Sequence, residues 1–312
     1  MTVLNIHTAL DYLAAMLQYN QNMKTFVTLV IATLCGFGGF YLQDTEAQVR
    51  SNRAQPTIVF SVSEESGNYN MDAVVAINGK LLRAPFAEDK EAQQDAFAKK
   101  YFAAGQKYRL LFGGGAAGTV TLKGWSRGCN SVHAEASATT TAPLGGQVRG
   151  LATNSEFLGT RSPARRAPTA AEREAVMALV KRIYSQRGVK PALYHSLAVT
   201  NLTATDLDGD GAYEIVGSFT LATKAKFQRD LFLIAKPEGA QMRADFINFQ
   251  AYQPPAEGFL SSIDFLDQLD LDGDGVGEVF AVQGGFDAYG FVIYKKRAGR
   301  WRQVYSGIGD AC

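Results

Sequence analysis

Apolar and polar residues alternate along much of the chain with a period of two, which is typical of β-strands that bury one face. In the N-terminal half, residues 55–62 and 73–77 alternate or are rich in β-branched residues, and an Asn-Gly pair follows the second run as a hairpin signal. Residues 107–112 and 119–123 flank a run of glycines and predict another hairpin. This half of the chain is therefore expected to form an antiparallel β domain.

Two segments follow a helical period instead. Residues 88–104 place small and aromatic residues at helical spacing, which predicts a short helix or a loop capped by one. Thr169-Ala-Ala-Glu172 is a capping box directly after Pro168, and an apolar stripe follows it. The stripe consists of Val176, Leu179, Val180 and Ile183. We expect an amphipathic helix here, with its stripe packed on one face of the β module that follows.

The segment between these regions, residues 145–168, has little apolar periodicity and contains Gly-Gly, Ser-Pro and Ala-Pro pairs. Such composition predicts a linker or a long surface connection. Its three arginines, Arg161, Arg165 and Arg166, are expected to be solvated.

An acidic motif occurs twice in the C-terminal half. Asp206–Glu214 and Asp270–Glu278 both read D-x-D-G-D-G-x-x-E and start 64 residues apart. A β-branched and aromatic run of strand length follows each copy, so each motif is expected to be a loop that leads into a strand. With the strands around it, each copy predicts a four-stranded meander of about 60 residues, the size of a propeller blade.

Four carboxylates within nine residues repel one another unless a cation lies among them. Calcium prefers several oxygen ligands in a flexible shell, and glycine at the sixth position of each motif permits the sharp turn. The expected ligands are side chains at positions 1, 3, 5 and 9 and the backbone carbonyl at position 7, for two calcium ions. They are Asp206, Asp208, Asp210, Ala212 and Glu214 in the first loop, and Asp270, Asp272, Asp274, Val276 and Glu278 in the second.

An EF-hand is excluded, because its bidentate glutamate at position 12 would fall on Gly217 or Ala281. The motif and its setting instead resemble the calcium-binding FG-GAP/VCBS-type repeats of β-propellers, over about residues 193–309. The resemblance implies structural calcium and a binding, adhesion or scaffold role, with an extracellular protein or glycan as the ligand. Two meanders cannot close a propeller, so they are expected to pack as a sandwich or as an incomplete propeller.

The predicted fold class is mainly β, in four parts: a signal region at 1–47, an N-terminal β domain at 48–144, the linker at 145–168, and the helix with the calcium-binding repeat module at 169–312. The signal region combines an upstream extension, 1–22, with a signal peptide, 23–47, whose apolar run ends at the small-residue site Thr45-Glu46-Ala47. We expect cleavage and export, with no membrane span in the mature chain. An uncleaved anchor is the alternative.

Charge and cysteine content narrow the possible functions. The net charge is +1, from 31 basic and 30 acidic residues, which gives no global field for nucleic acid.

After cleavage only Cys129 and Cys312 remain, and an exported pair of cysteines suggests one disulfide. Two independent thiols are the alternative.

A hydrolase is the main rival function, because Gly124-Trp-Ser126-Arg-Gly128 fits the loose G-x-S-x-G pattern of a serine nucleophile. His133 or His195 could then partner Ser126, with Glu156 as the acid. No βαβ series surrounds the motif, so we expect no catalytic residue and no histidine within hydrogen-bonding reach of Ser126. A surface filament or envelope subunit that associates with itself is a third possibility.

Overall fold

A computed structural model describes residues 55–223, 227–252, 262–285 and 287–311. The predicted signal region and Cys312 lie outside these residues. Within them the fold is mainly β, as the sequence predicts: a six-stranded antiparallel barrel is followed by one long helix and two antiparallel sheets. None of the described helices has the length and apolar character that a membrane span requires.

The barrel forms from the N-terminal half of the chain. Its strands pair in the order β1-β7-β4-β5-β6-β2, and β1 pairs with β2 to close the ring. The short strand β3 extends from β2 through a hairpin. The strands are β1 (Thr57–Glu65), β2 (Asn68–Asn78), β3 (Leu81–Arg83), β4 (Lys107–Phe112), β5 (Gly115–Arg127), β6 (Val132–Thr140) and β7 (Gly150–Thr153). Closure removes the exposed strand edges that an open sheet would carry.

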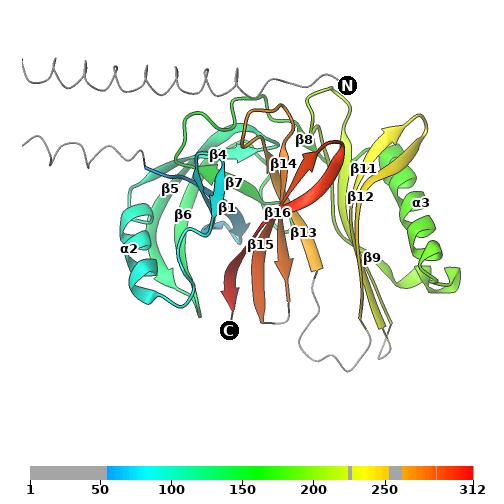
Figure 1. Ribbon diagram of the computed structural model, residues 1–312, viewed down its shortest axis with the longest axis horizontal. Helices are drawn as coiled ribbons and strands as arrows, with labels where there is room; N and C mark the ends of the chain where they lie inside the picture. The colour runs from blue at the N-terminus through cyan, green and yellow to red at the C-terminus, as the bar shows by residue number, and fades with distance from the viewer. Residues whose placement is uncertain (1–54, 224–226, 253–261, 286, 312) are drawn as a thin grey trace, which may run out of the picture. The chain divides into compact units, whose positions relative to one another are not determined.

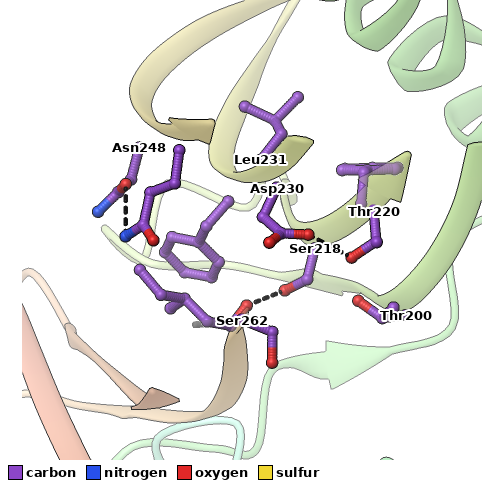
Figure 2. A pocket seen from close by; sticks show the side chains of 11 residues that line it. Thr200, Ser218, Thr220, Asp230, Leu231, Asn248 and Ser262 are labelled. Atoms are coloured by element: carbon purple, nitrogen blue, oxygen red, sulfur yellow. Dashed lines mark hydrogen bonds between the residues drawn. The ribbon is translucent and has the colours of Figure 1, made fainter. Parts of the chain in front are cut away.

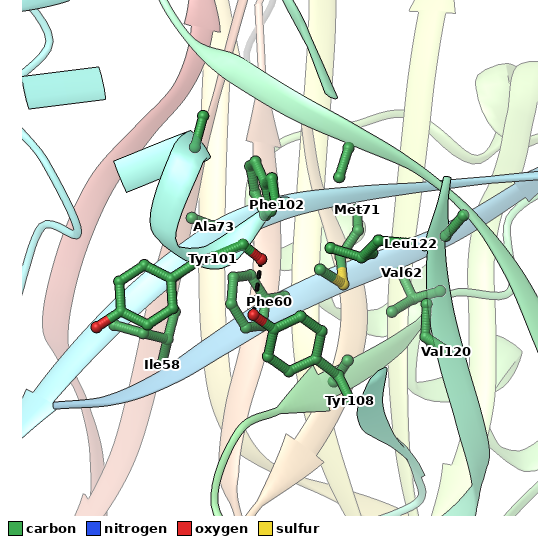
Figure 3. Packing of buried hydrophobic residues seen from close by; sticks show 14 of the residues in the cluster. Ile58, Phe60, Val62, Met71, Ala73, Tyr101, Phe102, Tyr108, Val120 and Leu122 are labelled. Atoms are coloured by element: carbon green, nitrogen blue, oxygen red, sulfur yellow. Dashed lines mark hydrogen bonds between the residues drawn. The ribbon is translucent and has the colours of Figure 1, made fainter. Parts of the chain in front are cut away.

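Aromatic side chains fill one end of the barrel (Figure 3). The helix α2 (Glu91–Tyr101) covers this end and contributes buried aromatic residues to it. Phe60 on β1 packs against Phe102 and Tyr108, with ring centroids 5.8 and 4.9 Å away. The Tyr108 hydroxyl donates a hydrogen bond of 2.6 Å to the backbone carbonyl of Tyr101, which satisfies the polar end of a buried ring. The alternation of β1 and β2 thus points one set of residues into a packed interior.

The two acidic motifs each lie between the first two strands of a meander. The first sheet is β8 (Arg165–Arg166), β9 (Leu197–Thr205), β10 (Glu214–Thr223), β11 (Phe227–Glu238) and β12 (Gln241–Tyr252), paired in chain order. The second sheet is β13 (Ser262–Leu269), β14 (Glu278–Gly284), β15 (Ala288–Arg297) and β16 (Arg300–Ala311), also in chain order. Both strands that leave a motif begin at its last glutamate, as expected.

These parts stack as barrel, second sheet, first sheet and helix α3 (Ala170–Gln186), from left to right in Figure 1. The second sheet is buried on both faces, which explains the continuous apolar run of β14. Phe280 and Val282 on β14 face the outer wall of the barrel, whereas Val279 and Ala281 face the first sheet. The two meanders therefore pack face to face, with the barrel against the free side of one of them.

Helix α3 covers the outer face of the first sheet, as its stripe predicts. Val176, Leu179, Val180 and Ile183 are buried there against β10 and β11. Its capping box forms, because the Thr169 hydroxyl accepts from the Glu172 amide and the Glu172 carboxylate accepts from the Thr169 amide. A short 3₁₀ helix, Pro191–Ser196, then leads into β9.

Residues 145–168 differ from the predicted linker. They contribute β7 to the barrel and β8 to the first sheet, so they belong to the packed structure. The prediction that Arg161, Arg165 and Arg166 are solvated is wrong for Arg165, whereas Arg161 and Arg166 are half-buried. The side chain of Arg165 is 2% exposed, pairs with the fully buried side chain of Asp267 at 3.5 Å, and lies over the rings of Phe112 and Phe265. The ion pair and the two aromatic rings compensate the buried charge of the Arg165 guanidinium group, which the composition of the segment predicts to be solvated.

Candidate metal centre

Each acidic loop is shaped by its first aspartate and two of its glycines. The Asp206 carboxylate accepts hydrogen bonds from the amides of Gly209 at 2.7 Å and Gly211 at 3.0 Å. Both glycines have positive φ angles, 71° and 84°, which L side chains rarely adopt. The second loop repeats this arrangement with Asp270, Gly273 and Gly275, at 2.8 and 3.0 Å. The sequence D-x-D-G-D-G therefore curls both loops in the same way.

Curling gathers carboxylate oxygens into one small volume in each loop. Oxygens of Asp206, Asp208 and Asp210 all lie within 4.8 Å of one another. Oxygens of Asp270, Asp272 and Glu278 do the same in the second loop. Ligands of a common calcium ion, each about 2.4 Å from it, lie within about 4.8 Å of one another. Each triad could therefore hold a metal ion.

The last glutamate of each motif is buried beneath its loop. Glu278 is 2% exposed, and its carboxylate accepts a hydrogen bond of 2.7 Å from the Leu271 amide. Glu214 accepts the equivalent bond of 3.0 Å from the Leu207 amide. Burial raises the pKa of both glutamates above the ordinary range. A negative charge at either position therefore needs a cation close by.

One lysine reaches into each loop from the third strand of its meander. Lys295 on β15 contacts Asp272, Asp274 and Glu278, at 2.7, 2.9 and 2.5 Å. Burial lowers the pKa of Lys295, but its bonds to these carboxylates outweigh that effect and raise it overall. The bond to Lys295 in turn lowers the pKa of Asp274. The ammonium group thus supplies positive charge to the loop without a metal ion.

The first loop holds its lysine less tightly. Lys236 on β11 lies 3.1 Å from Asp208, 3.2 Å from Asp210 and 3.5 Å from Glu214. Hydrogen bonds to Asp208 and Asp210 raise the pKa of Lys236. One carboxylate oxygen of Asp208, Oδ1, is buried and has no hydrogen-bond partner among the described residues. A buried carboxylate oxygen without a donor is a ligand position that a cation would satisfy.

The two loops lie against each other. The Gly277 amide donates a hydrogen bond of 2.7 Å to the Leu207 carbonyl, which joins the second loop directly to the first. Gln268 donates one of 2.8 Å to the Asp206 carbonyl. Arg161 donates to the Gly275 carbonyl, and its guanidinium group also lies beside Gly209. The two meanders therefore present one acidic centre with two candidate sites.

The structure brings together most of the residues that the sequence predicts. The triads leave out Glu214 in the first loop and Asp274 in the second, although both belong to the charge cluster through their lysine. Sequence reasoning missed Lys236, Lys295 and Arg161. The signal for the lysines was present, because the third strand of both repeats carries lysine near its end. The position of Arg161 carries no such signal.

The expectation that no histidine lies within reach of Ser126 is wrong. The Ser126 hydroxyl and His133 Nε2 are 2.8 Å apart, and the two residues are directly opposite each other on β5 and β6. Asp72 on β2 is the next residue in this row, directly opposite His133. Its carboxyl is buried, which raises its pKa, and the nearby His133 opposes that shift. Serine, histidine and aspartate thus lie in line across three strands.

Another polar crevice lies between the two sheets and is lined by Ser218, Asp230 and Asn248 (Figure 2). The Asp230 carboxylate accepts a hydrogen bond of 2.7 Å from Thr220, and burial raises its pKa. The crevice has a volume of about 10 Å³, enough for about one water molecule. It therefore offers no room for an organic ligand.

The chain matches no protein-family model, no curated protein and no solved structure. The resemblance of its loops to FG-GAP/VCBS-type repeats thus rests on the motif residues and on the strands that follow them.

Proposed function

We propose that this chain is an exported calcium-binding β-repeat protein, in which two calcium ions stabilise the paired loops and the role is binding, adhesion or scaffolding. The observation that carries the proposal is the convergence of three carboxylate oxygens in each loop to within 4.8 Å. Calcium fits better than magnesium, because it accepts a larger and more flexible oxygen shell than magnesium's rigid octahedron. FG-GAP/VCBS-type repeats, which the loops resemble, use calcium in the same structural sense.

The charge balance of the centre supports this proposal. The two motifs carry eight carboxylates, and Lys236, Lys295 and Arg161 supply three positive charges beside them. Two divalent ions would bring the centre close to neutrality. The last glutamate of each loop is buried at the start of a packed strand, which favours a structural ion over a catalytic one.

Isothermal titration calorimetry of the chelator-treated protein tests the proposal. We expect two calcium ions per chain and a melting temperature that falls when EGTA removes them. Asp272→Ala should abolish binding at the second loop, whereas Asp89→Ala should leave both sites intact, because Asp89 is an exposed carboxylate beside Lys90 outside the loops. An identical melting curve in EGTA and in calcium would refute the proposal.

A serine hydrolase is the second candidate, and the 2.8 Å contact between Ser126 and His133 favours it. A serine is activated when a histidine accepts its proton and a carboxylate orients the histidine. The carboxylate opposite His133 in the sheet is Asp72, rather than Glu156 as the sequence suggests, and it accepts a hydrogen bond of 3.4 Å from Ser61. The register of the sheet also explains the contact without catalysis, because residues directly opposite each other on antiparallel strands touch.

Labelling with a fluorophosphonate probe and hydrolysis of p-nitrophenyl butyrate test this candidate. A hydrolase loses both signals in Ser126→Ala and keeps them in Ser137→Ala, a change at an exposed serine on β6 of the same barrel. Absence of labelling in the wild-type chain would remove the hydrolase from consideration.

A further inference from the structure

A cavity of about 310 Å³ opens beside the second acidic loop. The β2–β3 hairpin contributes Ile77, Leu81 and Leu82 to its wall, and Leu271 and Val304 complete the apolar part. All of these except Leu81 pack against the core between the barrel and the second sheet, so the apolar floor is firmly held. Leu81 is 55% exposed, so its side chain is accessible at the rim of the cavity.

Charged groups line the rest of the cavity. Asp272 and Glu278 reach it from the loop, and Lys80, Lys295 and Arg297 reach it from the hairpin and from β15. The three cations outnumber the two carboxylates, so the lining carries a net positive charge. Neither Lys80 nor Arg297 forms an ion pair with a carboxylate of the described residues. Unpaired cations beside an apolar wall favour a ligand that is both anionic and apolar.

We propose that this cavity binds a small carboxylate attached to an apolar group, and that calcium in the second loop strengthens the binding. The proposal builds on the calcium sites proposed above and names a ligand class for the same centre. The volume lies at the lower end of the range for ligand pockets, about 300–1,000 Å³, which suits a group as small as one apolar amino acid. The apolar group lies against Leu81 and Leu82, and the carboxylate meets the cations.

Lys295 connects the cavity to the calcium site. Without a metal ion its ammonium group is held by Asp272, Asp274 and Glu278. A calcium ion bound to these carboxylates takes over their charge, which leaves Lys295 free to pair with an anion. The cavity then has a third available cation in addition to Lys80 and Arg297. Ligand and calcium therefore bind with positive coupling.

Ligand-observed NMR titration with N-acetyl-leucine tests this inference, with the neutral N-acetyl-leucinamide as the matched ligand. We expect the acid to bind at least tenfold more tightly in calcium than in EGTA, and the amide to bind at least tenfold more weakly than the acid. Leu81→Asn and Arg297→Gln should each weaken binding about tenfold. Ile247→Asn, a change at another exposed apolar residue on β12, should have no effect.

Calcium binding is measured separately by calorimetry on every variant. If the wild-type chain binds calcium but the acid does not bind, or binds no better than the amide, the ligand proposal is overturned and the proposed function stands. If calcium binds and leaves the affinity for the acid unchanged, the coupling through Lys295 is overturned. If no calcium binds, the calorimetric titration alone refutes the proposed function.

Discussion

Replacement of Lys295 by methionine separates the role of the lysine from that of the metal ion. Lys295 contacts three carboxylates of the second loop, and methionine keeps most of its apolar stem without the charge. In the absence of calcium the variant leaves Glu278, whose side chain is 2% exposed, without its cation. We therefore expect the calcium-free variant to be less stable than the calcium-free wild type.

The size of the effect follows from the exposure of the partners. Breaking a buried ion pair costs about 3–5 kcal/mol, and breaking an exposed one costs about 0–1 kcal/mol. Glu278 is buried, but Asp272 and Asp274 are 42% and 41% exposed, so the loss falls between these limits, at about 2 kcal/mol. With calcium bound, the ion supplies the positive charge in place of Lys295, so the variant and the wild type have similar stability. The thermodynamic cycle then requires the variant to bind calcium more tightly by the same free energy, about 30-fold.

Urea denaturation in EGTA and in saturating calcium measures the two stabilities, and calorimetry measures the affinity. Lys296→Met is the matched control, because the neighbouring lysine pairs with Asp245 at 2.7 Å rather than with the loop. The control should leave calcium affinity unchanged. A folded Lys295→Met chain with wild-type calcium affinity would show that the lysine and the ion do not compete.

Three further predictions concern other parts of the chain. Arg165→Met should lower the free energy of unfolding by about 3–5 kcal/mol, because it leaves a buried carboxylate unpaired. The loss, measured by urea denaturation, should shrink as the pH falls toward 6, because burial raises the pKa of Asp267 to about 6 against the opposing effect of Arg165, and without Arg165 the carboxyl is protonated at a higher pH, which removes the unpaired charge. The hydrogen bond from Arg166 is the main cause that lowers the pKa of Glu172 to about 2. The Glu172 carboxylate therefore stabilises the fold at pH values above its unfolded pKa, near 4.5, and this stabilisation is lost as the pH falls toward 2. Glu172→Gln keeps the helix cap but does not titrate. In acid titrations, the free energy of unfolding of the wild type should fall by about 1 kcal/mol relative to this variant over that pH range, after allowance for solvent exposure. Peptide mapping should recover Cys129 and Cys312 in one disulfide-linked pair that reduction separates, and recovery of both as alkylated thiols would contradict this.

Most of the fold could be predicted because local signals and tertiary packing agree. The capping box at Thr169 and the stripe after it define α3, and the acidic motifs fix the turn between two strands in each meander. The closure of the barrel through β7 could not be predicted. Gly150–Thr153 is only four residues long, and its pairing with β1 and β4 is set by contacts distant in sequence. Short strands without turn signals carry little local information.

The sequence predicts carboxylates that converge in each loop, although Glu214 and Asp274 lie outside the two triads, and it does not predict the groups around them. Spacing within nine residues determines which carboxylates converge, so Asp206–Asp210 could be identified from the motif alone. The contact between the two loops depends on how one sheet packs on the other, which joins Gly277 to Leu207 across 70 residues. The pairing of Ser126 with His133 depends on strand register, which is a long-range property of the barrel.

The buried guanidinium group of Arg165 ties three parts of the chain to one another. It donates hydrogen bonds of 2.7 Å to the carbonyls of Arg149 and Leu266, and the Asp267 carboxylate beside it accepts from the Gly113 amide of the barrel. A gene fragment that began after this arginine would leave the Asp267 carboxylate uncompensated, and one that ended before it would leave the outer wall of the barrel bare. Domain shuffling could therefore move residues 56–311 only as one piece, and heating should melt them in a single calorimetric peak.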